Sequence, residues 1–131
     1  PKFVKKLINL EAPTINGDGT FSRDFTFIDN IININELAIK VQDKSAINTI
    51  YNAACGERNS LSKLAKLLKK YLSIYNSKIS DINFINGPER EGDIPHSHAS
   101  IKKAKEKLNY KPKYDFESGL KKSIEWYWKN L

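Results

Sequence analysis

The sequence contains one cysteine, Cys55, among its 131 residues. A single thiol excludes an internal disulfide and a zinc site built from several cysteines. Sparing use of cysteine is typical of a reducing compartment, so we expect a cytoplasmic protein. No apolar run approaches the roughly 20 residues that a membrane-spanning helix needs, so no membrane partner is expected.

Catalytic motifs are also missing. The sequence has no Gly-x-Ser-x-Gly nucleophile elbow and no Gly-x-x-x-x-Gly-Lys-Ser/Thr phosphate loop, and no tyrosine is followed by lysine four residues later. The run Gly17-Asp18-Gly19 begins like a dinucleotide fingerprint, but Ser22 breaks the pattern and a strand is expected to follow. The sequence therefore predicts no catalytic residue and no cofactor site.

The two histidines and the cysteine form no recognisable site. His96 and His98 are two residues apart with no third ligand nearby, which is a weak pattern for a metal. Cys55 has no identifiable base beside it and is interpreted as a buried or incidental cysteine. No metal is predicted.

The net charge of +7 comes mainly from lysine. Many lysines, such as Lys63, Lys66 and Lys70, fall on the polar faces of predicted helices, which is ordinary helix amphipathicity. A basic module that binds nucleic acid remains an alternative. Against it, the sequence has no interleaved aromatic platform and no recognised nucleic-acid motif.

The three arginines differ from the lysines because they lie in or beside turn-like stretches: Arg23 in SRDF, Arg58 in GERNS and Arg90 in PEREG. A guanidinium group binds phosphate or carboxylate with two hydrogen bonds, which lysine does not match. The carboxylate of Asp93 can accept hydrogen bonds from sugar hydroxyls. These residues suit a diphosphate that carries a sugar or a nucleoside.

A simpler alternative is that the arginines form surface ion pairs, Arg23 with Asp24, and Arg90 with Glu89 or Glu91. Such pairs are common and contribute little to stability.

Hydrophobic periodicity predicts a small α/β domain with more helix than strand. Ser60, Ser100 and Asp115 are expected to cap helices, and Asp29 or Asn30 to cap another. The expected helices cover residues 3–10, about 30–41, 61–75, 101–109 and 116–131, and the expected strands cover 24–28, 48–54 and 81–86, after an extended piece near 13–16.

Two stretches, PTINGDGTFSRDFTFIDNI and GPEREGDIPHSHASIKKAKEKLNYKPKYDFESGLKKSIEWY, resemble the C-terminal substrate-binding part of NAD-dependent epimerase/dehydratases, the extended short-chain dehydrogenase/reductases. The nearest similarity is to bacterial UDP-N-acetylglucosamine 4-epimerases of surface-polysaccharide and lipopolysaccharide synthesis. YNAACGERNSL matches the middle strand, turn and helix of that part. The resemblance implies one domain, residues 1–131, with short strands and about five helices and without the Rossmann domain.

The resemblance also implies roles for six residues in binding a UDP-sugar. Arg23 and Arg90 would hold the diphosphate, and Asp93 would bond a ribose hydroxyl. Thr14 and Asn16 would lie beside the uracil.

The sixth residue, Ser97, would face the sugar. Relatives restricted to non-acetylated sugars have a bulky tyrosine at the matching place, so a serine leaves room for an N-acetyl group. His96 would help to shape the same loop.

The family's NAD loop and its Tyr-x-x-x-Lys pair, whose tyrosine is the acid/base for transient oxidation at C4, are implied to lie in a domain absent from this sequence. We therefore expect the chain alone to be inactive and to hold no NAD, and the parent enzyme to dimerise through that domain. Because the sequence begins at Pro1, we expect it to be a fragment of a longer protein. A neighbouring nucleotide-sugar dehydratase or decarboxylase remains an alternative.

Overall fold

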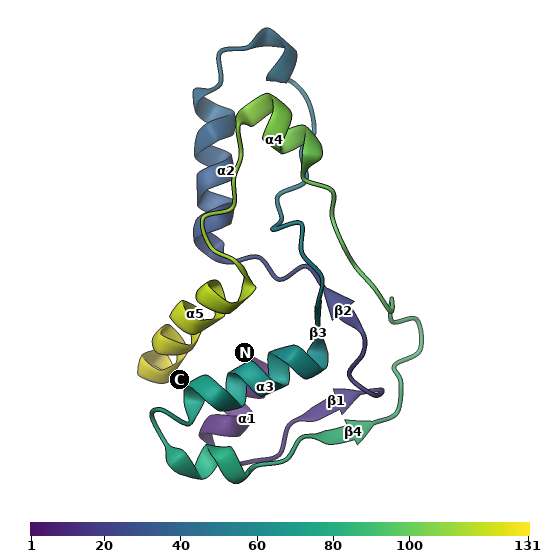
Figure 1. Ribbon diagram of the computed structural model, residues 1–131, viewed down its shortest axis with the longest axis vertical. Helices are drawn as coiled ribbons and strands as arrows, with labels where there is room; N and C mark the ends of the chain where they lie inside the picture. The colour runs from purple at the N-terminus through teal and green to yellow at the C-terminus, as the bar shows by residue number, and fades with distance from the viewer.

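Five helices and four very short strands make up the computed structural model, which describes residues 1–131 (Figure 1). This confirms the predicted small mixed α/β domain. The elements are α1 (Lys2–Ile8), β1 (Thr14–Asn16), β2 (Ser22–Arg23), α2 (Ile28–Lys40), β3 (Asn59–Ser60), α3 (Leu61–Leu72), β4 (Ile85–Gly87), α4 (Lys102–Leu108) and α5 (Phe116–Asn130), with single 3-10 turns at Lys44–Ala46 and Ser77–Asp81. None of the helices is both long and apolar enough to cross a membrane.

The strands form two separate pairs. β1 and β4 are parallel and in register from Thr14 opposite Ile85 to Asn16 opposite Gly87. β2 and β3 are antiparallel, and Ser22 of β2 also forms a parallel bridge with His96. β2 therefore lies between β3 and the loop that runs up one side of Figure 1 from β4 to α4.

Apolar side chains gather in two cores at opposite ends of the molecule. One core joins α2, α4 and the first 3-10 turn, where α2 and α4 lie side by side (Figure 1). The other joins α1, α3 and α5. Helical periodicity places Ile34, Leu68 and Ile124 in these cores, and all three are buried. Leu10 and Leu131, at the ends of two predicted helices, lie beyond α1 and α5 and are exposed.

Two of the predicted strands are wrong. Residues 24–27 form neither helix nor strand, and Ile28 already begins α2. Residues 48–54 also pair with no strand. Of the predicted strand 81–86, only its last two residues belong to β4. A stretch of strand-forming residues becomes a strand only where a second strand completes the hydrogen-bond ladder.

Of the four predicted helix caps, two are confirmed and two are wrong. The Ser60 hydroxyl accepts from the Lys63 amide at 3.1 Å, and the Asp115 carboxylate accepts from the Ser118 amide at 2.8 Å, so both caps are confirmed. Ser100 does not cap α4, which begins at Lys102 with no side-chain cap. Neither Asp29 nor Asn30 caps α2, since both lie inside the helix.

Candidate functional site

Four of the six predicted binding residues line one polar hollow of about 350 Å³: Arg23, Arg90, Asp93 and Ser97. Arg23 comes from β2, whereas the other three come from the loop between β4 and α4. The rest of the lining is Glu91, Gly92 and Ile94, so Ile94 is the one apolar contributor. The structure therefore brings together two segments about 70 residues apart in the sequence.

β2 fixes where Arg23 points. The Ser22 amide donates to Pro95 O at 2.9 Å, and the Ser97 amide donates to Ser22 O at 3.0 Å. Because side chains alternate along a strand, Ser22 and Arg23 face opposite sides. Ser22 is buried, and Arg23 turns toward the hollow.

Arg23 is held by the loop that it faces. Its Nη1 donates to Ile94 O at 2.6 Å and to Ser22 O at 2.9 Å, and its Nη2 forms an ion pair with Asp93. The alternative of a surface pair with Asp24 is wrong, because Asp24 instead accepts hydrogen bonds from the amides of Cys55 and Gly56, both at 3.0 Å.

Arg90 is exposed and has no ion-pair partner, so the predicted pairing with Glu89 or Glu91 is also wrong. Its carbonyl accepts from the Asp93 amide at 3.1 Å, which closes a tight turn. Gly92 has a φ of +75° in that turn, a conformation that glycine adopts without strain. The Arg90 guanidinium is thus available to an anion at the rim of the hollow.

Thr14 and Asn16, the other two predicted residues, do not line this hollow. They lie on β1 with exposed side chains on either side of the buried Ile15. β1 pairs with β4, from which the loop of the hollow departs, so the two residues lie on a strand beside the loop's origin.

Sequence reasoning did not identify the contacts behind the hollow. The Ser22 hydroxyl and His96 Nδ1 are 2.9 Å apart, and Arg58 Nε donates to Ser22 Oγ at 3.3 Å. Ser22 and His96 are 74 positions apart, so no local spacing could reveal this pair. The one available signal was strand alternation, which separates Ser22 from Arg23.

The glycine turn does not fit a dinucleotide. The Asp18 carboxylate accepts from the Thr20 amide at 2.8 Å, and the hydroxyl and amide of Thr20 lower the pKa of Asp18. The chain then enters β2, a strand that ends before the predicted strand 24–28, whereas a dinucleotide fingerprint leads into a helix whose N-terminus faces the pyrophosphate. Residues 17–19 are therefore a structural turn. Elsewhere in the chain, no group of three His, Cys, Asp or Glu side chains is placed to hold a metal ion.

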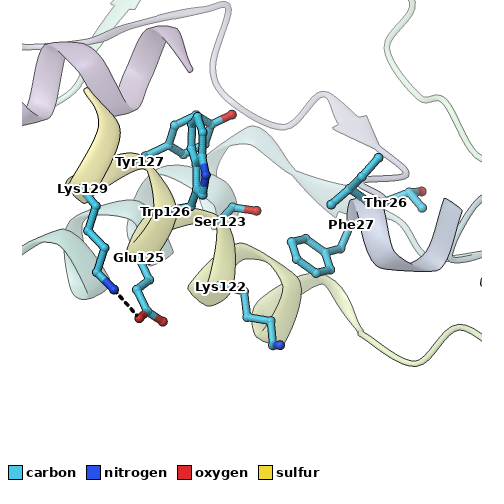
Figure 2. Close-up of a pocket in the computed structure, with 9 residues that line it drawn as sticks. Thr26, Phe27, Lys122, Ser123, Glu125, Trp126, Tyr127 and Lys129 are labelled. Carbon is cyan, nitrogen blue, oxygen red and sulfur yellow. Dashed lines mark hydrogen bonds and ion pairs between the residues drawn. The ribbon is translucent and has the colours of Figure 1, made fainter. Parts of the chain in front are cut away.

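A larger groove of about 590 Å³ lies between residues 26–28 and α5 (Figure 2). Phe27 and Trp126 supply aromatic surface to it, and Lys129 is already paired with Glu125 at 3.0 Å. An adjoining groove of about 680 Å³ is lined mainly by apolar residues of α1, α3 and α5. Neither contains an arginine, so the smaller polar hollow is the better anion site despite its size.

Comparison with known proteins places this arrangement in a family. The family described as GDP-mannose 4,6 dehydratase matches residues 1–123. UDP-glucuronate 4-epimerase 4 of Arabidopsis thaliana is 34% identical over 119 residues, which are 83% of this chain and 26% of that protein.

Two solved structures are each 32% identical to this chain with a TM-score of 0.85. UDP-glucose 4-epimerase of Thermotoga maritima, with UDP-glucose, is matched over 99% of this chain and 39% of its own. UDP-N-acetylglucosamine 4-epimerase of Methanobrevibacter ruminantium, in complex with UDP-N-acetylmuramic acid, is matched over 100% and 39%. The chain spans well under half the length of these relatives. It belongs to the GDP-mannose 4,6 dehydratase family and corresponds to the C-terminal part of an NAD-dependent epimerase/dehydratase.

Proposed function

We propose that residues 1–131 form the UDP-sugar-binding domain of a nucleotide-sugar 4-epimerase that interconverts UDP-N-acetylglucosamine and UDP-N-acetylgalactosamine. The observation that carries the proposal is the convergence of Arg23, Arg90, Asp93 and Ser97 on one polar hollow. The similarity to epimerases named for UDP-glucose and UDP-N-acetylglucosamine supports a UDP-linked sugar.

The chemistry of each side chain suits one part of this ligand. The unpaired guanidinium of Arg90 is free to bind the diphosphate with two hydrogen bonds. Arg23, oriented by Asp93 and Ile94 O, provides a second positive charge. The remaining lone pairs of Asp93 can accept from the ribose hydroxyls.

The two ends of the ligand involve the other predicted residues. Ser97 is small and exposed at the hollow, which leaves space for an N-acetyl group on the sugar. Thr14 and Asn16 on β1 would contact the uracil, which requires the nucleoside to extend from the hollow toward β1.

The remaining machinery would belong to the part of the relatives that this chain does not span. NAD would bind there and accept and return a hydride, while this chain binds and orients the sugar nucleotide. We expect the whole protein to dimerise through that part, in the cytoplasm. The 131-residue chain alone should not epimerise UDP-N-acetylglucosamine when NAD is added.

A nucleotide-sugar 4,6-dehydratase is the second candidate. The family's own description favours it, as does 30% identity over 134 residues to dTDP-D-glucose 4,6-dehydratase of Mus musculus. The two activities differ in product, because a dehydratase loses water and forms a keto sugar.

The test is to incubate the full-length protein with NAD and UDP-N-acetylglucosamine and to identify the product by chromatography and mass. We expect UDP-N-acetylgalactosamine, with unchanged mass. Because Arg90 would contribute charge-assisted hydrogen bonds, Arg90→Ala should raise KM at least about tenfold. Lys105→Ala, an exposed charge change on α4, is the matched control. A product lighter by one water supports the dehydratase, and an unchanged KM in Arg90→Ala overturns the proposed site.

A further inference from the structure

We propose that Ser22 and His96 form a tether that positions the binding loop from behind, without contacting the ligand. This inference rests on the proposed function, because it concerns the placement of Asp93 and Ser97 toward a UDP-sugar. The loop is defined as residues 88–98, from the end of β4 to the approach to α4.

Few hydrogen bonds join the loop to the rest of the molecule. It contains no helix or strand, and nearly all of its residues are exposed. Every hydrogen bond that links it to the rest of the molecule goes to Ser22 or Arg23. Two adjacent residues of β2 therefore make all of the hydrogen bonds between the loop and the rest of the molecule.

These two residues hold the loop on opposite faces. On the face of the hollow, Arg23 binds Asp93 and Ile94 O. On the other face, the hydroxyl of Ser22 bonds His96 Nδ1 at 2.9 Å. The backbone of Ser22 adds the bonds to Pro95 and Ser97. His96 does not line the hollow, whereas the next residue, Ser97, does.

Arg58 adds a third member to the tether. Its Nε donates to Ser22 Oγ at 3.3 Å, which occupies one lone pair of that oxygen. The Ser22 hydroxyl keeps its proton and a second lone pair for His96 Nδ1, and the tautomer of the ring sets which of the two atoms donates. The requirement at position 96 is thus a polar atom at the place of Nδ1, which the side-chain amide of asparagine can approximate.

Loss of the bond between Ser22 and His96 should change the position of the loop more than the stability of the fold. Ser22 and His96 belong to neither apolar core, so the loss of their bond should leave both cores intact. It should instead allow Ser97 and Asp93 to shift relative to Arg23. Displacements of about 1 Å in a positioned group can cost up to about a hundredfold in activity.

The experiment measures binding of UDP and UDP-N-acetylglucosamine to the full-length protein by calorimetry, with amide hydrogen exchange at Ser97. We expect His96→Leu and Ser22→Ala to weaken UDP-N-acetylglucosamine binding about tenfold and to speed exchange at Ser97, with little change in Tm. His96→Asn should recover most of the affinity. His98→Leu is the matched control, because His98 is exposed and makes no side-chain hydrogen bond.

The outcomes separate the two proposals. If the wild type binds neither UDP nor UDP-N-acetylglucosamine, the proposed function fails and the tether fails with it. If Arg23→Ala and Arg90→Ala lose binding but His96→Leu binds like the wild type, the tether alone is overturned. It is also overturned if His96→Asn is as weak as His96→Leu, since a polar atom at the place of Nδ1 would then not matter.

Discussion

Asn30 shows how much one buried polar side chain holds in place. It is fully buried in α2, and its Oδ1 accepts from the amides of Lys113 at 2.9 Å and Tyr114 at 3.1 Å. Its Nδ2 donates to Tyr114 O at 2.7 Å. The side chain therefore attaches α2 to the segment that leads into α5.

Replacing Asn30 should be costly, because buried amides and a carbonyl would lose their partners. We expect Asn30→Ala to lower the free energy of unfolding by about 3 kcal/mol, measured by urea denaturation. Asn35→Ala on the same helix removes only a bond from an exposed amide to Ile31 O and should cost less than about 1 kcal/mol. Equal losses in the two variants would contradict this role of Asn30.

The site residues illustrate what a sequence can and cannot reveal about single positions. The turn-like settings of Arg23 and Arg90, with the carboxylate of Asp93, indicated a site for a diphosphate that carries a sugar or nucleoside, and resemblance supplied Ser97. The alternative of a surface ion pair named Asp24, the neighbour of Arg23, whereas the structure pairs Arg23 with Asp93. Such a pairing over about 70 residues depends on tertiary structure, which local charge patterns do not encode.

At the scale of helices and strands, local signals located the five helices better than they located the strands. Helix periodicity and capping residues act within one segment, so α3 and α5 begin where Ser60 and Asp115 predict. Residues 24–28 and 48–54 have strand-forming composition, but no second strand of this chain pairs with them. A strand is a property of two segments, so its prediction requires knowledge of both.

The cap of α5 makes a testable case. Asp115→Ala should cost about 1 kcal/mol of stability at neutral pH, because the Ser118 amide loses its acceptor. Ser100→Ala is the matched control, since Ser100 does not cap α4 and its replacement should be nearly neutral. Comparable losses in both variants would argue against an Asp115 cap.

The stability that Asp115→Ala loses should become smaller at acidic pH. Bonds from the Ser118 hydroxyl and amide lower the pKa of Asp115 from its usual 3.8. A carboxyl whose pKa is depressed on folding contributes stability above its unfolded pKa and loses it as the pH falls through the folded value. The difference between wild type and Asp115→Ala should therefore shrink below about pH 4, as urea denaturation across a pH series can show.

The whole molecule has its two cores at opposite ends. The two halves are joined at a junction formed by α2, residues 24–27 and 54–56, and the start of α5. Figure 1 shows the resulting extended shape, with the α2–α4 end at the top and α1, α3 and α5 below. Polar bonds from Asp24 and Asn30, in addition to aromatic packing of Phe27 on Tyr114, bind this junction. Which segments would meet there was not visible from element order alone.

The single thiol lies inside that junction and can serve as a built-in reporter of its opening. Cys55 is buried, with Sγ 3.4 Å from Asn30 Nδ2 and 3.6 Å from Tyr114 O, and burial raises its pKa. A thiol reagent should therefore label the native chain slowly and once per molecule. In Asn30→Ala the rate should rise at least about tenfold, because labelling must wait for the two halves to part. Equally slow labelling of both proteins would mean that the halves stay joined without Asn30.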